Sequence, residues 1–156
     1  AGGATGGGMP GASELAEMSP REAADRRFNR TMRLQSAGDT AGRAPFFARM
    51  GVRAYRRVPA REAGSDLRFH VGLLQLVQGE TDAAMAEADS ILAAEPGHLL
   101  GIYLAARAAE ASGDGAAASR WRDSLRSAAS RADLDARPEY RAHRSLLEQA
   151  AADEGS

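Results

Sequence analysis

The stretch SDLRFHVGLLQLVQGETDAAMAEADSILAAEPGH, residues 65–98, decides the fold. Its first half places apolar side chains at helical spacing, and Gly79 ends that helix because glycine adopts the left-handed conformation freely. A second helix follows Thr81, which we expect to cap it, and stops before Pro96. Neither half alternates apolar and polar residues as a β-strand does. We therefore predict a helical hairpin here and an all-α chain overall.

The turn inside this hairpin has counterparts on both sides. Gly38, Gly79 and Gly113 each precede an acidic residue, which is favourable near the start of the next helix. Gly79 and Gly113 lie 34 residues apart, and Gly38 and Gly79 lie 41 apart. A period of 34 residues is typical of one class of helical-hairpin repeat. We therefore predict three hairpins in a row.

Helix signals fill the rest of the chain. Ser19 and Glu22, with Pro20 between them, form a capping box that starts the first helix. Pro45 and Pro138 each suit the first position of a helix. The predicted helices cover about 20–37, 45–58, 66–78, 81–95, 99–112, 116–130 and 138–152.

The central hairpin resembles the tetratricopeptide repeat (TPR) family when Ser65 is taken as position 1. The family's small residues at positions 8 and 20 fall on Gly72 and Ala84, and its helix-ending proline at position 32 falls on Pro96. The next unit has the small or turn residues Ala106, Gly113 and Ala118 at positions 8, 15 and 20. The family's aromatic residues at positions 4, 11 and 24 are replaced in the central unit by Arg68, Gln75 and Ala88.

The resemblance implies a right-handed α-solenoid of three helical hairpins over about residues 20–152, with a C-terminal capping helix over the last apolar face. Small residues at positions 8 and 20 would let the two helices of a hairpin approach closely. We expect three parts: a flexible Gly-rich leader at 1–18, the repeat domain at 19–152 and a disordered tail at 153–156. The first unit, about residues 24–64, departs from the family by insertions.

In this family the first helix of each hairpin lines a concave groove. Position 5 is aromatic in every unit, although aromatic residues make up only 5% of the chain. The resemblance therefore implies that the rings grip a partner segment, whereas the alternative is that they fill the core in place of the missing family aromatics. The predicted groove residues are Phe28, Met32, Phe69, His70, Leu73, Tyr103, Arg107 and Tyr140.

Composition excludes several kinds of chemistry. The chain has no Lys and no Cys, which removes Schiff-base enzymes, thiol nucleophiles and cysteine zinc sites. The three histidines are far apart in the sequence, and Glu139 with His143 is interpreted as a surface pair four residues apart on one helix. We predict no enzyme activity, no catalytic residues, no metal site and no cofactor.

The net charge of −1 is the sum of a basic N-terminal part and an acidic C-terminal part. Residues 20–68 hold 12 Arg against 5 acidic residues, whereas residues 69–156 hold 8 Arg against 14. Helical spacing groups a basic patch of Arg49, Arg53, Arg56 and Arg57. This patch is either a solvated helix face or a contact for an acidic partner or anionic lipid, and we expect no nucleic-acid binding because no aromatic residues interleave with it.

These observations predict a non-catalytic scaffold or assembly subunit that binds a protein segment in its groove. The leader is compatible with a tether to a membrane or a larger complex, and hence with an extracytoplasmic or envelope location in a GC-rich bacterium; a cytoplasmic location is the alternative. The rival hypothesis is a homo-oligomer that stacks end to end through its basic and acidic halves.

Overall fold

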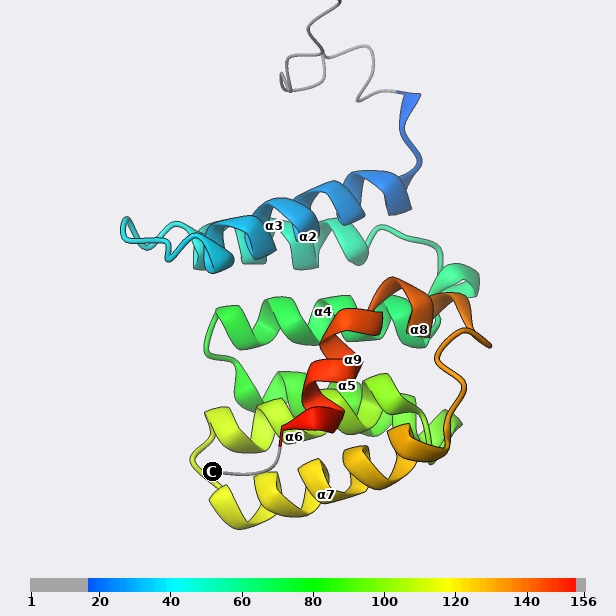
Figure 1. Ribbon diagram of the computed structural model, residues 1–156. Coiled ribbons are helices and arrows are strands. Elements are labelled where there is room, and N and C mark those ends of the chain that lie inside the picture. Colours follow the sequence, from blue (N-terminus) through cyan, green and yellow to red (C-terminus); the bar gives the residue numbers. More distant parts are fainter. Residues whose placement is uncertain (1–16, 154–156) are drawn as a thin grey trace, which may run out of the picture.

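The computed structural model describes residues 17–153, and in this range the chain forms eight α-helices that pack in adjacent pairs, with no strand (Figure 1). The all-α prediction is therefore confirmed for the described part. The predicted tail, apart from its first residue, and the leader up to residue 16 lie outside it. The three pairs are α2 (Pro20–Ser36) with α3 (Ala44–Tyr55), α4 (Ser65–Val77) with α5 (Thr81–Ala94), and α6 (Leu99–Ala111) with α7 (Gly115–Arg131).

Local sequence signals explain most of the helix ends. The Ser19 hydroxyl accepts a hydrogen bond from the Glu22 amide at 3.1 Å, and the Glu22 carboxylate accepts one from the Ser19 amide at the same distance, so the predicted capping box is confirmed. Gly38, Gly79 and Gly113 all have positive φ values, of 86°, 76° and 83°. Each of the three predicted turns therefore ends its helix with a glycine in the left-handed conformation.

Two of the three acidic residues after these glycines form hydrogen bonds with the start of the next helix, whereas Glu80 forms no such bond with its side chain. The Asp39 carboxylate accepts bonds from the Arg43 and Ala44 amides at the start of α3, at 2.9 and 2.6 Å. Asp114 accepts from the Ala117 amide at the start of α7, at 3.0 Å. The prediction that Thr81 caps α5 was wrong, because Glu80 is the N-cap residue of that helix and Thr81 is already helical.

Two predicted helix boundaries also change. The second helix ends at Tyr55, and a short 3₁₀ turn, η1 (Ala60–Glu62), leads from it to α4. The seventh helix is broken into α8 (Pro138–Ala142) and α9 (Arg144–Ala152), because His143 leaves the helical conformation with φ −117° and ψ 23°. Together α8 and α9 form what we call the C-terminal segment, residues 138–152.

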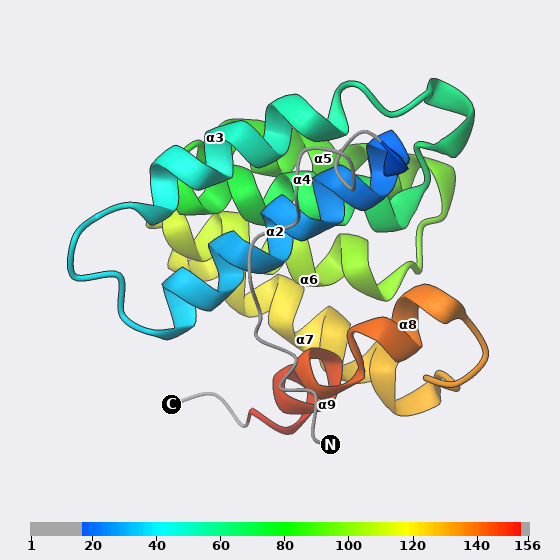
Figure 2. The same cartoon turned by 90° about the horizontal axis from the view of Figure 1, so that it is seen from above.

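The C-terminal segment reaches further than a cap on the last helix. It lies on the side of the stack opposite α3 and α5, as the two perpendicular views show (Figures 1 and 2). Its α9 packs on α7 and α6. The Tyr140 hydroxyl accepts a bond from the Leu99 amide at 3.1 Å, and Arg137, immediately before the segment, pairs with Glu95 in the loop before α6. The segment is thus fastened to the beginning of α6 as well as to the end of the stack.

A small residue allows two helices to approach closely at Gly72, but the two helices are α4 and α6, which belong to different hairpins. A Cβ atom added to Gly72 would lie 2.3 Å from Leu104 Cδ2 in α6, the first helix of the next hairpin. The expectation that position 8 spaces the two helices of its own hairpin is corrected accordingly. Leu104 is fully buried, so its side chain has little room to withdraw.

The first prediction follows from this contact. Gly72→Ala should lower the free energy of unfolding by about 1–3 kcal/mol, because the added methyl overpacks α4 against α6. Urea unfolding followed by circular dichroism measures the change. Gly115→Ala is the matched control, since its Cβ meets nothing within 4 Å at the first position of α7. A gain in stability of about 1 kcal/mol, which alanine gives over glycine inside a helix where the methyl has room, would contradict the close approach.

None of the helices in the described range combines the length and the apolar character that crossing a lipid bilayer requires.

Candidate functional site

A group of polar side chains lies where the first two hairpins meet the C-terminal segment. Two of its pairs have a spacing of four residues, which places Arg21 and Asp25 on one face of α2, and Asp66 and His70 on one face of α4. Tyr55 comes from the end of α3, and His143 from the junction of α8 and α9. We call this group the polar cluster: Arg21, Asp25, Tyr55, Asp66, His70 and His143.

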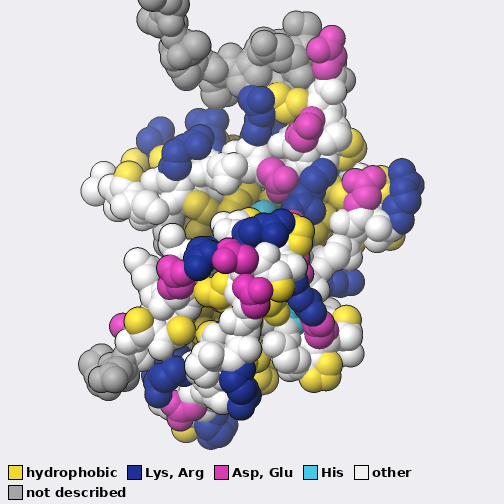
Figure 3. Space-filling model, turned by 45° about the vertical axis from the view of Figure 1, so that its right-hand side comes forward, with side chains coloured by type: hydrophobic (Ala, Val, Ile, Leu, Met, Phe, Trp, Pro, Cys, Tyr) yellow, Lys and Arg dark blue, Asp and Glu magenta, His cyan; other side chains and the backbone are white. Residues whose placement is uncertain are grey.

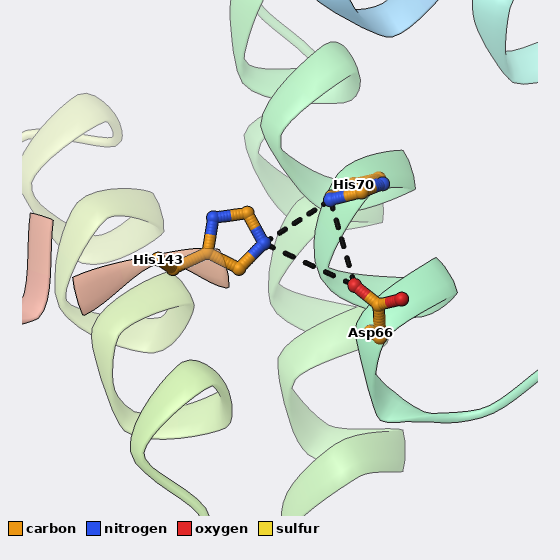
Figure 4. A group of neighbouring side chains, drawn as sticks. All are labelled: Asp66, His70 and His143. Carbon is orange, nitrogen blue, oxygen red and sulfur yellow. Dashed lines mark hydrogen bonds and ion pairs between the residues drawn. The ribbon is translucent and has the colours of Figure 1, made fainter. Parts of the chain in front are cut away.

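Hydrogen bonds fix the orientation of the His70 ring. The Tyr55 hydroxyl lies 2.6 Å from Asp25 Oδ1 and 2.8 Å from His70 Nδ1. Because the hydroxyl has one proton and donates it to the carboxylate, the His70 Nδ1–H donates to the Tyr55 oxygen. This tautomer leaves a lone pair on His70 Nε2, and that atom faces His143 Nε2 at 3.1 Å (Figure 4).

Arg21 holds both carboxylates of the cluster. Its Nε lies 3.0 Å from each oxygen of Asp25, and one of its terminal nitrogens donates to Asp66 Oδ2. The other oxygen of Asp66, Oδ1, is therefore turned toward the histidines, 3.5 Å from His70 Nε2 and 3.9 Å from His143 Nε2. Figure 4 shows the three side chains converging from α4 and the C-terminal segment.

The surroundings set the charges of these groups. The His143 ring and the Arg21 guanidinium hold the pKa of Asp66 well below its usual range, although burial opposes them. Burial lowers the pKa of His70 from 6.5 to about 4, so its ring is neutral at neutral pH. Burial and the neighbouring Asp25 raise the pKa of the Tyr55 hydroxyl, which stays protonated. The cluster thus holds two carboxylates against the single guanidinium of Arg21.

Aromatic rings enclose the imidazoles. Phe28 stacks on His70 with ring centroids 4.1 Å apart, and Phe69 meets His143 edge to face at 4.8 Å. Phe69 also contacts Tyr103 at 5.8 Å. Two of the position-5 rings, Phe69 and Tyr103, therefore pack against each other, and Phe69 also packs against the C-terminal segment.

The predicted groove residues accordingly separate into two groups. Five of them are buried: Phe28, Phe69, His70, Leu73 and Tyr140. Met32 and Tyr103 are half-buried, and Arg107 is exposed. His143 of the C-terminal segment packs against Phe69 and His70. Of the two interpretations of the rings, filling the core agrees with the burial of Phe28, Phe69 and Tyr140.

An open pocket does remain further along the stack. It has a volume of about 610 Å³ and lies between α6, α7 and α9. Its apolar lining includes Tyr103, Leu125 and Leu146. Its charged lining consists of Arg107, Arg122, Glu110 and Asp153. Tyr103 and Arg107 are the two predicted groove residues that line this pocket.

The predicted basic patch lies in the first hairpin, away from the pocket. Arg49 and Arg53 are exposed on α3, and Arg56 and Arg57 are exposed in the turn that follows it. Figure 3 shows several Arg side chains on the surface of this first layer. Two large apolar side chains on α3 are also exposed, Phe46 by 57% and Met50 by 38%.

The polar cluster was not predicted from the sequence, because the histidines are far apart along the chain and only their sequence separations were considered. Folding brings His70 and His143, 73 residues apart, into contact. Glu139 does not join His143 and instead lies 3.3 Å from the Nε2 of the buried His98. One signal was present: Asp25 and Asp66 each stand 13 residues before a turn glycine, so stacked units place them side by side.

Comparisons of the chain with protein-family models, with curated proteins and with solved structures found no match. The functional interpretation therefore depends on the residues and their geometry.

Proposed function

We propose that this chain is a non-catalytic protein-binding subunit, built on a right-handed TPR-like stack of helical hairpins. The adjacent pairing of α2 to α7 and the left-handed turns at the repeated glycines support this architecture. The proposed contact is with a short segment of a partner protein. Its place is the pocket between α6, α7 and α9, because most of the predicted groove residues are buried, whereas Tyr103 and Arg107 line this pocket.

The composition of the pocket is the observation that carries the proposal. Its volume of about 610 Å³ suits a few partner side chains. Tyr103, Leu125 and Leu146 supply an apolar floor for an anchoring side chain.

The rim carries two exposed arginines. Arg107 and Arg122 each lie 3.9 Å from the same carboxylate oxygen of Glu110, and their side chains are 55% and 40% exposed. Asp153 is a second carboxylate of the lining, so the rim has no net charge, but both guanidinium groups are exposed enough to pair with a carboxylate of a partner. We therefore propose that the partner segment carries an apolar anchor beside an acidic residue.

A library of random peptides displayed on phage tests the proposal. Peptides selected on the wild-type chain should combine an apolar residue with Asp or Glu, and their affinity is measured by fluorescence anisotropy. Charge reversal in Arg107→Glu with Arg122→Glu should weaken binding by at least about tenfold, since like charges would then face each other.

Two control variants make the outcome specific. Arg120→Glu changes an exposed arginine of α7 that does not line the pocket, so affinity should stay unchanged. The double variant Arg49→Glu with Arg53→Glu reverses the charge of two exposed arginines in the basic patch, and it should also leave the affinity unchanged. Selected peptides that bind the pocket variant as they bind the wild type, or that lose affinity only for the patch variant, would contradict the proposal.

End-to-end stacking receives no comparable support. The last helix of the stack, α7, carries four Arg against one Asp. The first hairpin is also basic, so charge does not favour contact between the two ends of the stack. The acidic excess of the C-terminal half lies instead in α5, which has three acidic residues and no Arg, and in the loops between the helices.

A further inference from the structure

We propose that Asp66, His70 and His143 form a binding site for a divalent transition-metal ion of the zinc type. The first observation is the distance between the three facing atoms. Asp66 Oδ1, His70 Nε2 and His143 Nε2 form a triangle with sides of 3.1, 3.5 and 3.9 Å. A point equidistant from the corners of that triangle lies about 2 Å from each, which is the length of a Zn–N or Zn–O bond.

The second observation is that each ligand is held in place by a further group. Tyr55 and Asp25 fix the His70 ring from its Nδ1 side, and the lone pair of Nε2 faces the centre of the triangle. Arg21 binds Asp66 Oδ2 and turns Oδ1 the same way. Packing against Phe69 orients the His143 ring. Metal sites commonly use such outer groups to select the tautomer and direction of their ligands.

Charge and ligand chemistry narrow the choice of ion. Both imidazoles bind a metal in their neutral form, and the cluster then holds two carboxylates against one guanidinium, a negative charge that a divalent cation would balance. Two imidazole nitrogens and one carboxylate oxygen suit zinc and its neighbours, whereas calcium and magnesium prefer shells of six or more oxygens. The side chains of His70 and His143 are only 11% and 13% exposed, but that of Asp66 is 37% exposed, so a water molecule could complete four-coordination from that side.

Binding requires His143 to change its tautomer. The proton that His143 Nε2 contributes to its contact with His70 Nε2 passes to water, and Nδ1 takes up a proton from water, so that the ring stays neutral and Nε2 can bind the metal. The metal would replace the hydrogen bond between the two rings. It would thereby fasten the C-terminal segment to α4.

Titration of the tag-free chain with Zn²⁺, after treatment with EDTA and its removal, tests the site. We expect one Zn²⁺ per chain by isothermal calorimetry and a rise in the unfolding temperature with added Zn²⁺, because the ion binds the folded state. Asp66→Asn and His143→Gln should each weaken the affinity by about tenfold or more. Glu139→Gln is the control, since it alters the other His–carboxylate pair, at His98, and should leave the affinity unchanged.

Two further measurements keep the test decisive if a variant folds poorly. Circular dichroism in EDTA reports whether each variant is folded. Co²⁺ added to the wild-type chain should give the intense visible absorption of a four-coordinate centre, and ¹⁵N NMR with Zn²⁺ should show metal-bound Nε2 in both His70 and His143. No stoichiometric binding by the wild type, or binding that Glu139→Gln abolishes while Asp66→Asn and His143→Gln leave it unchanged, would overturn the proposal. The cluster would then be a hydrogen-bonded network only.

Discussion

Phe69→Ala should lower the free energy of unfolding by about 3–5 kcal/mol, the largest effect we expect from a single substitution in the chain. The ring has no exposed surface, and it contacts Tyr103, His70 and His143 with centroids 5.8, 6.4 and 4.8 Å away. Its removal would leave a cavity between α4, α6 and the C-terminal segment. Urea unfolding followed by circular dichroism measures the loss.

Phe46→Ala is the matched control for this variant. The Phe46 ring is 57% exposed on α3, so its removal should change the stability by no more than about 0.5 kcal/mol. If Phe69→Ala cost as little as Phe46→Ala, the Phe69 ring would be an open groove surface rather than part of the core. A large cost also means that lost partner binding in this variant reports damage to the fold.

Leu147→Ala should lower the free energy of unfolding by about 2–5 kcal/mol. Leu147 lies on α9, is fully buried and belongs to the same core as α4 and α6. The effect would show that the C-terminal segment is part of the cooperative fold. The same urea experiment measures it, and Gln149→Ala, an exposed position on the same helix, is the control and should be near neutral.

The opposite outcome would show that α9 is not part of the cooperative fold. If α9 were detached from the stack, Leu147→Ala and Gln149→Ala would both leave the unfolding midpoint unchanged. The pocket would then lose one of its walls, because Leu146 and Ala150 of α9 line it.

Local chemistry made most of the helices predictable from the sequence. A helix end needs only a few neighbouring residues, such as Ser19 with Glu22 or a glycine that adopts positive φ at Gly38, Gly79 and Gly113. The repeated turns also predicted that neighbouring helices pair. The error at Thr81 is also local, because the N-cap position of α5 falls one residue earlier, on Glu80, whose side chain makes no capping hydrogen bond.

The candidate site depended on long-range packing and was harder to predict. The path of the C-terminal segment is set by contacts of Tyr140 with α6 and of His143 with α4. The residues near Tyr140 and His143 in the sequence do not indicate these contacts. For the same reason the aromatic residues at position 5 could be recognised as a series but not assigned to groove or core. The repeated position of Asp25 and Asp66 could be seen in the sequence. The contact of His70 with His143, 73 residues further along the chain, could not, and it is this contact that makes the aspartates part of a cluster.

The pocket and the metal site both depend on one claim, that the C-terminal segment lies against α4 and α6 with His143 facing His70. Nuclear Overhauser contacts in the isotope-labelled, tag-free chain measure this placement directly. We expect cross-peaks from the His143 ring protons to the Phe69 ring, whose centroid is 4.8 Å away, and from the Tyr140 ring to Leu99. Cross-peaks from His143 and Tyr140 that are confined to their own segment would contradict the placement, and with it both proposals.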